Sequence, residues 1–215
     1  MTKKVFIKTT LCCFILFFVS CNTVKELAKQ EISKQVINLQ KCEFKLDNVV
    51  NFKVAGIDIS KISNIKDISL LDAAKLVQTF NSKKVPVSFT LNVAAHNPND
   101  GTSGTTKSLV TLQKLDWSLL VDGIQTITGA VNQPIDIPSS SEQKTIIPLD
   151  MGLDLYEFFG NKGYESLINV ALAVGGVGGS ASKLTLNAKP TISTPFGPIE
   201  YPNEIQIIER EFRGN

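Results

Sequence analysis

The sequence predicts a mainly β fold of antiparallel strands with two helical insertions, and three observations lead to it. Residues 85–95 carry an apolar side chain at every second position, the pattern of a strand with one buried and one solvated face. Asp122-Gly123, a dipeptide favoured in two-residue hairpin turns, separates two further alternating runs. Residues 69–81 repeat their apolar side chains every three or four positions, which indicates an amphipathic helix.

Residues 1–20 have the order of a secretory signal. A basic start is followed by the apolar run Val5–Val19, and the small Ser20 precedes Cys21. The end of this segment resembles the lipobox of a bacterial lipoprotein, which implies that Cys21 becomes the lipidated N-terminus. The apolar run has about 15 residues against the roughly 20 that span a bilayer. An ordinary signal peptide or a membrane anchor is the alternative.

The location of the mature protein is predicted from the residues around Cys21. Stable anchoring needs more than one acyl chain, which lipoprotein processing supplies. No acidic run follows Cys21 in Asn22-Thr23-Val24. We therefore expect a lipid-anchored protein of the cell envelope, on the periplasmic face of the outer membrane.

The charge of the mature chain is close to zero. Three of the 22 lysines and arginines lie in residues 1–20, which leaves 19 against 20 acidic side chains. This balance argues against a nucleic-acid partner. No run of basic residues reaches the size that binds anionic lipid. The single histidine, His96, has no cysteine or second histidine at metal-ligand spacing, so we expect neither a metal nor another cofactor.

The remaining elements follow from periodicity and from turn residues. Residues 21–41 are rich in Lys, Glu and Gln, with apolar side chains on one helical face, and predict a helical tether. Two short strands are expected around Asn48–Asn51, and the second helical insertion spans Leu153–Val174, interrupted by glycines. The other expected strands cover residues 115–121, 124–131, 144–149, 184–192 and 205–212.

One motif carries a family resemblance. A strand that ends in Asn97-Pro98-Asn99, followed by a strand pair joined at Asp122-Gly123, resembles the late embryogenesis abundant group 2 domain. This domain is also called the water-stress and hypersensitive-response domain of desiccation-related proteins. The resemblance covers residues 44–209. It implies that residues 42–215 form an immunoglobulin-like or fibronectin-like β-sandwich without catalytic apparatus.

Two residues are the candidates for catalysis. Cys42 is the only mature thiol besides Cys21, and it opens an alternating run that predicts a buried small hydrophobe. His96 lies beside the Asn97-Pro98-Asn99 corner, where a polar rim residue is expected. Their distance in the sequence leaves a Cys42–His96 pair of nucleophile and base open, which would make the protein a hydrolase.

The sequence therefore predicts a non-catalytic, lipid-anchored module that binds or stabilises something, with a stress-related role implied by the resemblance. The first alternative is a carrier of an apolar ligand, because Phe158-Phe159 next to Gly160 predicts a crevice between the sandwich and the second helical segment. The second alternative is the hydrolase. The partner is the membrane, through lipid on Cys21, together with an unidentified protein or apolar ligand.

Overall fold

The computed structural model describes residues 24–59, 62, 68–102, 107–140, 142–163 and 182–212. The signal segment and Cys21 lie outside these residues. The described chain forms a 10-stranded sheet in the order β5-β4-β8-β10-β1-β3-β7, with β2, β6 and β9 attached to β1, β4 and β8. The strands are β1 (Glu43–Val54), β2 (Ile57–Asp58), β3 (Pro86–His96), β4 (Val110–Val121), β5 (Ile124–Val131), β6 (Ile135–Ile137), β7 (Lys144–Asp154), β8 (Ser182–Ile192), β9 (Ile199–Glu200) and β10 (Ile205–Phe212).

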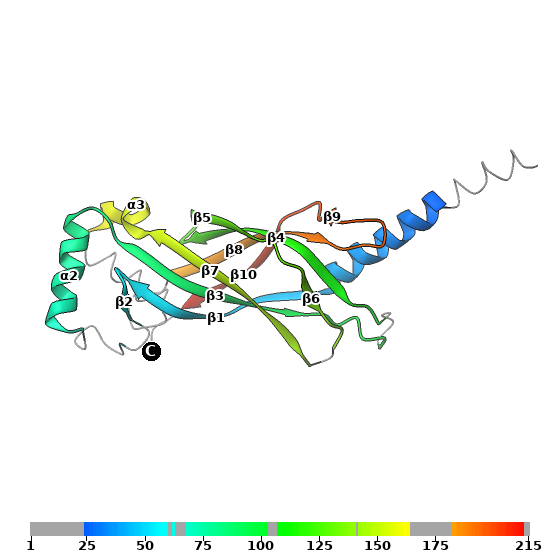
Figure 1. Cartoon of the computed structure of the whole chain (residues 1–215), viewed down its shortest axis with the longest axis horizontal. Coiled ribbons are helices and arrows are strands. Elements are labelled where there is room, and N and C mark those ends of the chain that lie inside the picture. The colour runs from blue at the N-terminus through cyan, green and yellow to red at the C-terminus, as the bar shows by residue number, and fades with distance from the viewer. Residues whose placement is uncertain are drawn as a thin grey trace, which may run out of the picture.

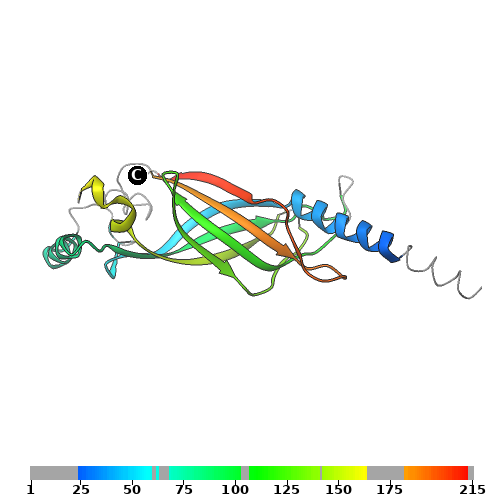
Figure 2. The same ribbon diagram turned by 90° about the horizontal axis from the view of Figure 1, so that it is seen from above.

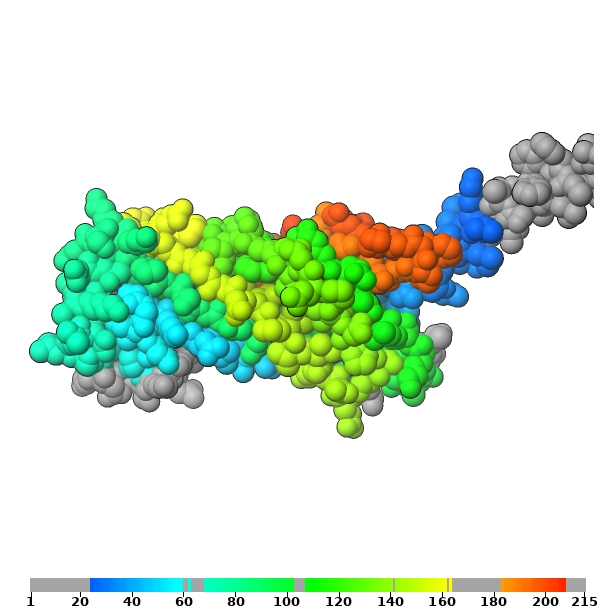
Figure 3. Space-filling view, viewed as in Figure 1, coloured from blue at the N-terminus to red at the C-terminus, as the bar shows by residue number. Residues whose placement is uncertain are grey.

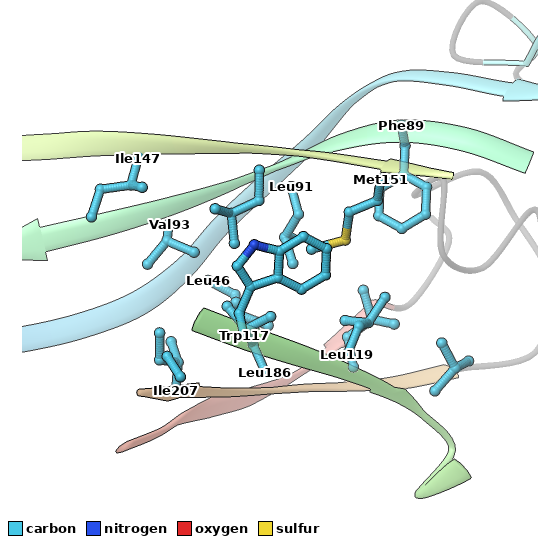
Figure 4. Packing of buried hydrophobic residues seen from close by; sticks show 14 of the residues in the cluster. Leu46, Phe89, Leu91, Val93, Trp117, Leu119, Ile147, Met151, Leu186 and Ile207 are labelled. Atoms are coloured by element: carbon cyan, nitrogen blue, oxygen red, sulfur yellow. The ribbon is translucent and has the colours of Figure 1, made fainter. Parts of the chain in front are cut away.

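The sheet folds into two layers that face each other across one core. Strands β1, β3 and β7 form one layer, and β4, β5, β8 and β10 form the other (Figures 1 and 2). Figure 4 shows Leu91 of β3 and Met151 of β7 facing Trp117 of β4 and Leu186 of β8 across this core. The predicted mainly β, antiparallel, sandwich-like fold is confirmed. The layers join through β1 and β10, which pair in parallel, whereas every other pairing is antiparallel among the described strands.

The first strand differs from its prediction. Residues 43–54 form one continuous strand instead of two, because register shifts near Asn48 and Asn51 absorb the irregular residues without ending the pairing with β3. Asn51 has a φ of 57°, the left-handed conformation that asparagine tolerates. The chain turns only at Ala55-Gly56, where both φ angles are positive, and returns as β2.

The predicted hairpin between β4 and β5 is confirmed, with Asp122 and Gly123 at φ angles of 51° and 78°. Gly129 of β5 lies opposite Trp117 of β4. A Cβ atom at Gly129 would lie 2.2 Å from an indole carbon of Trp117. The glycine therefore makes room for a core tryptophan.

The helices agree with the sequence in part. Helix α2 (Leu70–Asn81) confirms the helix expected over residues 69–81, and it begins after Ser69, whose Oγ accepts a hydrogen bond from the Asp72 backbone N–H at 3.1 Å. The second insertion is shorter in its described part: α3 (Leu155–Phe159) and a 3₁₀ turn over Gly160–Lys162. Leu153 belongs to β7, because its pairing with β3 continues to Asp154. Residues 164–174 of the predicted helix lie outside the described residues.

The predicted tether is a helix over residues 24–41, called the N-terminal helix below. It extends from one end of the elongated sandwich, whereas α2 and α3 cover the opposite end (Figures 1 and 2). Leu39, in its last turn, is 1 % exposed and belongs to the core cluster. None of the described helices is both long and apolar enough to cross a membrane.

Candidate functional site

The Asn97-Pro98-Asn99 corner lies where β3 ends, beside the N-terminal helix. The Nδ2 group of Asn97 donates to the backbone carbonyls of Ser108 and Ile137, each at 2.8 Å. The same residue accepts, at Oδ1, from the backbone N–H of Asn99 at 3.1 Å. One side chain thus ties the end of β3 to the residues that enter β4 and to β6, and it also closes its own turn.

The second asparagine of the corner holds the N-terminal helix. Asn99 donates from Nδ2 to the backbone carbonyl of Asn38 at 2.9 Å and to Asn97 Oδ1 at 2.7 Å. Asn38 lies in the last turn of the helix, where carbonyls lack intrahelical partners. The Asn38 side chain donates in turn to Ser108 Oγ at 2.9 Å. The corner therefore caps the helix and fixes its last turn to the sandwich.

This role was not visible in the sequence, where the corner carried only the family resemblance. Asn97 and Asn99 are both 0 % exposed. The amide groups of both residues donate within the protein, and because the side chains are buried they are not presented to an external ligand. The sequence feature that could have indicated this role is the pair of asparagines at a strand end, because asparagine side chains can hydrogen-bond to the backbone of other chain segments.

The two candidate catalytic residues are not brought together. Cys42 packs against the core and directs its thiol to the Asn38 carbonyl, with 3.4 Å between Sγ and O. His96 lies on the outer side of the sheet, where Nε2–H donates to the Ser140 carbonyl at 2.8 Å. Its Nδ1 is 3.9 Å from a carboxylate oxygen of Glu43, the cross-strand neighbour. Because Cys42 and Glu43 are consecutive and face opposite sides, Cys42 and His96 do not form a nucleophile–base pair.

The environment of Cys42 also disfavours a reactive thiol. Burial raises the pKa of Cys42 from 9.0 to about 12, because the thiolate would lose its solvation. A reactive cysteine has a lowered pKa and an electropositive neighbourhood. The side chain therefore serves as a small hydrophobe with a weak S–H donor, the reading that its alternating sequence context favoured.

The two phenylalanines proposed to line an apolar crevice lie in α3 and differ in exposure. Phe159 is 0 % exposed and part of the core cluster. Phe158 is half-buried, and its ring centroid lies 6.4 Å from that of Phe159. Tyr156 of the same helix makes an edge-to-face contact with Phe80 of α2, with 5.5 Å between the ring centroids, and this contact joins the two helices. Phe159 therefore fills the interface under α3 instead of lining an open crevice.

Two hollows lie on the outer faces of the sheet. The larger, of about 470 Å³, is lined by residues of β4, β5 and β8, including Ser118, Thr128 and Asn187. Two of its charged side chains are paired on the surface: Asp116 with Lys114 at 2.8 Å, and Lys189 with Glu200. The hydrogen bond with Glu200 raises the pKa of Lys189. Glu204 also lines the hollow, which therefore presents charges of both signs.

The smaller hollow, of about 230 Å³, surrounds His96 and includes Glu43, Lys45, Glu142 and Lys144. Its mixture of charges is typical of a solvated sheet face. Within the described part of the chain, no group of three or more His, Cys, Asp or Glu side chains is placed to hold a metal ion.

The most unusual surface lies on α2, at the end of the molecule opposite the N-terminal helix (Figure 1). Leu70 and Leu71 are 88 % and 81 % exposed. The sequence predicted an amphipathic helix here, and the face that packs is formed by Leu76 and the half-buried Phe80. Leu70 and Leu71 lie on the other side of the helix, about 120° or more from Leu76.

Comparisons with known proteins identify no family for this chain. No family model matches, and no curated protein matches. Among solved structures, the chain is similar to a putative late embryogenesis abundant protein, with 14 % identity over 91 % of this chain and 86 % of that one and a TM-score of 0.37. It is similar to a protein of Arabidopsis thaliana, with 14 % identity over 80 % of this chain and 82 % of that one and a TM-score of 0.35.

A protein from Archaeoglobus fulgidus is similar at 14 % identity over 61 % of this chain and 86 % of that one, with a TM-score of 0.30. Likenesses at these values carry no conclusion about function.

Proposed function

We propose that the mature protein is a non-catalytic module of the cell envelope, anchored by lipid on Cys21, that binds or stabilises a partner in a stress-related role. The observation that carries the proposal is the fixed attachment of the N-terminal helix. The described part of this helix, residues 24–41, follows closely on the proposed anchor in the sequence, and its last turn is bonded to the Asn97-Pro98-Asn99 corner.

The helix then acts as a spacer of defined direction. Its 18 residues correspond to about 27 Å of rise. Its exposed face carries charged side chains, including the pair Lys29–Glu26 at 2.9 Å, so it tolerates water along most of its length. A lipid on Cys21 would place the membrane at this end and direct α2 away from it. The periplasmic face of the outer membrane is the proposed site.

The alternatives have less support. The hydrolase requires a thiolate and a base, whereas Cys42 has a raised pKa and His96 lies on the other side of the sheet. The carrier of an apolar ligand requires an open crevice at Phe158-Phe159, whereas Phe159 is fully buried. We therefore favour the binding or stabilising module over both.

Partitioning of the Cys21→Ala variant tests the anchor. Wild-type protein is expected in the detergent phase, and Cys21→Ala in the aqueous phase after signal processing, because the acceptor for the acyl chains is lost. Cys42→Ser is the matched control, since it removes a thiol that receives no lipid. Equal partitioning of wild type and Cys21→Ala would refute the proposal.

The absence of catalysis is tested on the same preparation. We expect no turnover in a screen of ester, phosphate, peptide and glycoside substrates. Turnover that disappears in Cys42→Ser or His96→Ala, with an unchanged melting temperature, would replace the binding module by an enzyme.

A further inference from the structure

One edge of the sheet ends in β7, a long strand with a proline near its centre. Among the described strands, β7 pairs only with β3. It has 11 residues, and its side chains alternate between an exposed and a buried face. Ile146 is 47 % exposed, and the strand lies on the visible face of Figure 3, where its residues are yellow-green. A long, exposed and partly apolar edge strand is a template on which another chain can pair.

The register of β7 shows which of its backbone groups face this edge. Leu155, which follows the strand, donates its backbone N–H to the Val85 carbonyl at 2.9 Å. These two residues continue the register in which Asp154 pairs with Pro86. In an antiparallel ladder, hydrogen-bonded pairs alternate with pairs whose N–H and C=O groups point away from each other. The odd-numbered residues of β7 therefore bond to β3, and the even-numbered ones direct their backbone groups to the open edge.

Pro148 interrupts the row of donors on that edge. It is exposed and pairs with Asn92 in the register, so it is one of the even-numbered residues that face outwards. Proline has no N–H group, and its ring occupies the space that an incoming strand would need. The other even-numbered residues from 144 to 152 keep their N–H groups. The edge therefore has a gap near its centre, at a position where a sheet tolerates proline.

The described strands of the chain do not pair with this edge themselves. Thr145 Oγ1 donates to the Asp136 carbonyl of β6 at 3.4 Å, so β6 lies beside the start of β7. The backbone of β6, however, pairs with β4. Within the described part of the chain, the edge of β7 thus has a side-chain contact at one end and no backbone ladder.

The strand at the other end of the sheet has a different safeguard. Among the described strands, β5 pairs only with β4, and their register shifts so that Thr126 is left without an opposite residue. Thr126 Oγ1 donates to the Leu119 carbonyl at 3.1 Å, which fixes this irregularity. A bulge bends and twists an edge strand, so that it no longer offers a flat surface for pairing. The two edges thus carry the two devices, a bulge and a proline, that disfavour the addition of a strand.

We propose that Pro148 keeps this domain from pairing with a second copy of the chain through the edges of two β7 strands. The partner excluded is the same strand, aligned antiparallel about a two-fold axis. Position 148 is central enough that any ladder longer than about half of β7 contains it in both copies. In each such ladder the two prolines remove two N–H donors and place their rings between the strands. This inference does not depend on the proposed function, because it concerns the fold alone.

The test is sedimentation velocity of the mature chain over a range of concentrations. Every sample carries Cys21→Ala, so that lipid cannot bring copies together. The chain with Pro148 is expected to remain a monomer. Pro148→Val restores the missing N–H group in a residue that favours strands, and should form dimers at concentrations about tenfold lower or less, the effect of two added backbone hydrogen bonds.

Two controls locate the contact. Pro148→Asp also restores the N–H group, but it adds a carboxylate to a strand that already holds Asp150 and Asp154, so this variant should remain a monomer. Pro134→Val restores an N–H group at an exposed proline outside the strands and should change nothing. In the Pro148→Val dimer, hydrogen exchange of the amides in residues 146–150 should slow on association.

The remaining outcomes overturn the inference. A monomeric Pro148→Val chain would show that the proline is not what prevents pairing, and slow exchange of residues 146–150 in that monomer would show that the chain's own strands cover the edge. Equal association of the Pro148→Val and Pro148→Asp variants would place the contact elsewhere. If Pro148→Val lowers the melting temperature, Pro148→Ala, which restores the same N–H group, replaces it with the same expected and contrary results.

Discussion

At the scale of single residues, burial decides the chemistry of the one core thiol. Cys42 is followed by two apolar residues in alternation, which predicted a buried side chain, but only its packing shows how far the pKa rises. The nucleophilic form of a cysteine is the thiolate. A pKa of about 12 keeps Cys42 protonated, and therefore inert, at neutral pH.

Alkylation kinetics test this residue. With Cys12, Cys13 and Cys21 replaced by serine, Cys42 should react about a thousandfold more slowly in the native state than in denaturant at pH 7, as the shift from 9.0 to about 12 implies. The unfolded chain ionises first as the pH rises above 9.0, so stability falls between pH 9.0 and about 12. Similar native and denatured rates would contradict this environment.

Trp117 shows the same dependence on context. It lies in the expected strand over residues 115–121 and is 9 % exposed. Its ring lies against Gly129 of the neighbouring strand. Which residue lies against the ring depends on strand register, which one residue type does not encode.

At the scale of elements, the period of two in β3 determines which side chains form the core. Val87, Phe89, Leu91 and Val93 are all buried, and the polar residues between them face outwards. The strand begins at Pro86, which lacks an N–H group and is tolerated there. The register of this strand was therefore readable from the sequence.

A denaturant melt of two neighbouring positions tests that register. Leu91 is 0 % exposed, so Leu91→Ala should cost about 2–5 kcal/mol of unfolding free energy through lost burial and a residual cavity. Asn92 lies on the outer side and donates to Asn48 Oδ1 at 2.8 Å, so Asn92→Ala should cost within about 0.5–1 kcal/mol. Equal losses would mean that the strand is misplaced by one residue.

At the scale of the whole molecule, the two ends have different roles. The N-terminal helix is fixed at one end by the Asn97-Pro98-Asn99 corner, and α2 lies at the other end (Figure 2), where Leu70 and Leu71 are exposed. The sandwich between them fixes the orientation of the N-terminal helix relative to α2. The corner is therefore the joint on which the spacer function depends.

Asn99→Ala should loosen this joint. It removes the donors to the Asn38 carbonyl and to Asn97 Oδ1, and a lost buried hydrogen bond that leaves its partner unsatisfied costs about 1–3 kcal/mol. Hydrogen exchange of the amides in residues 36–41 should accelerate more than that of the β3 core. Asn92→Ala is the control, since its side chain does not touch the helix. Uniform acceleration over the whole domain would show that Asn99 supports the sandwich and not the joint.

The sequence by itself determined the local features of this protein. The mainly antiparallel β fold, the hairpin at Asp122-Gly123, the strand register of β3 and the cap of α2 all follow from neighbours within a few residues, where side-chain period and turn chemistry act. The tertiary structure alone decided the joining of β1 with β10, the burial of the corner and the exposure of Leu70 and Leu71 on α2. These depend on contacts between segments that are distant along the chain, such as Asn38 with Asn99, and no local pattern encodes such contacts.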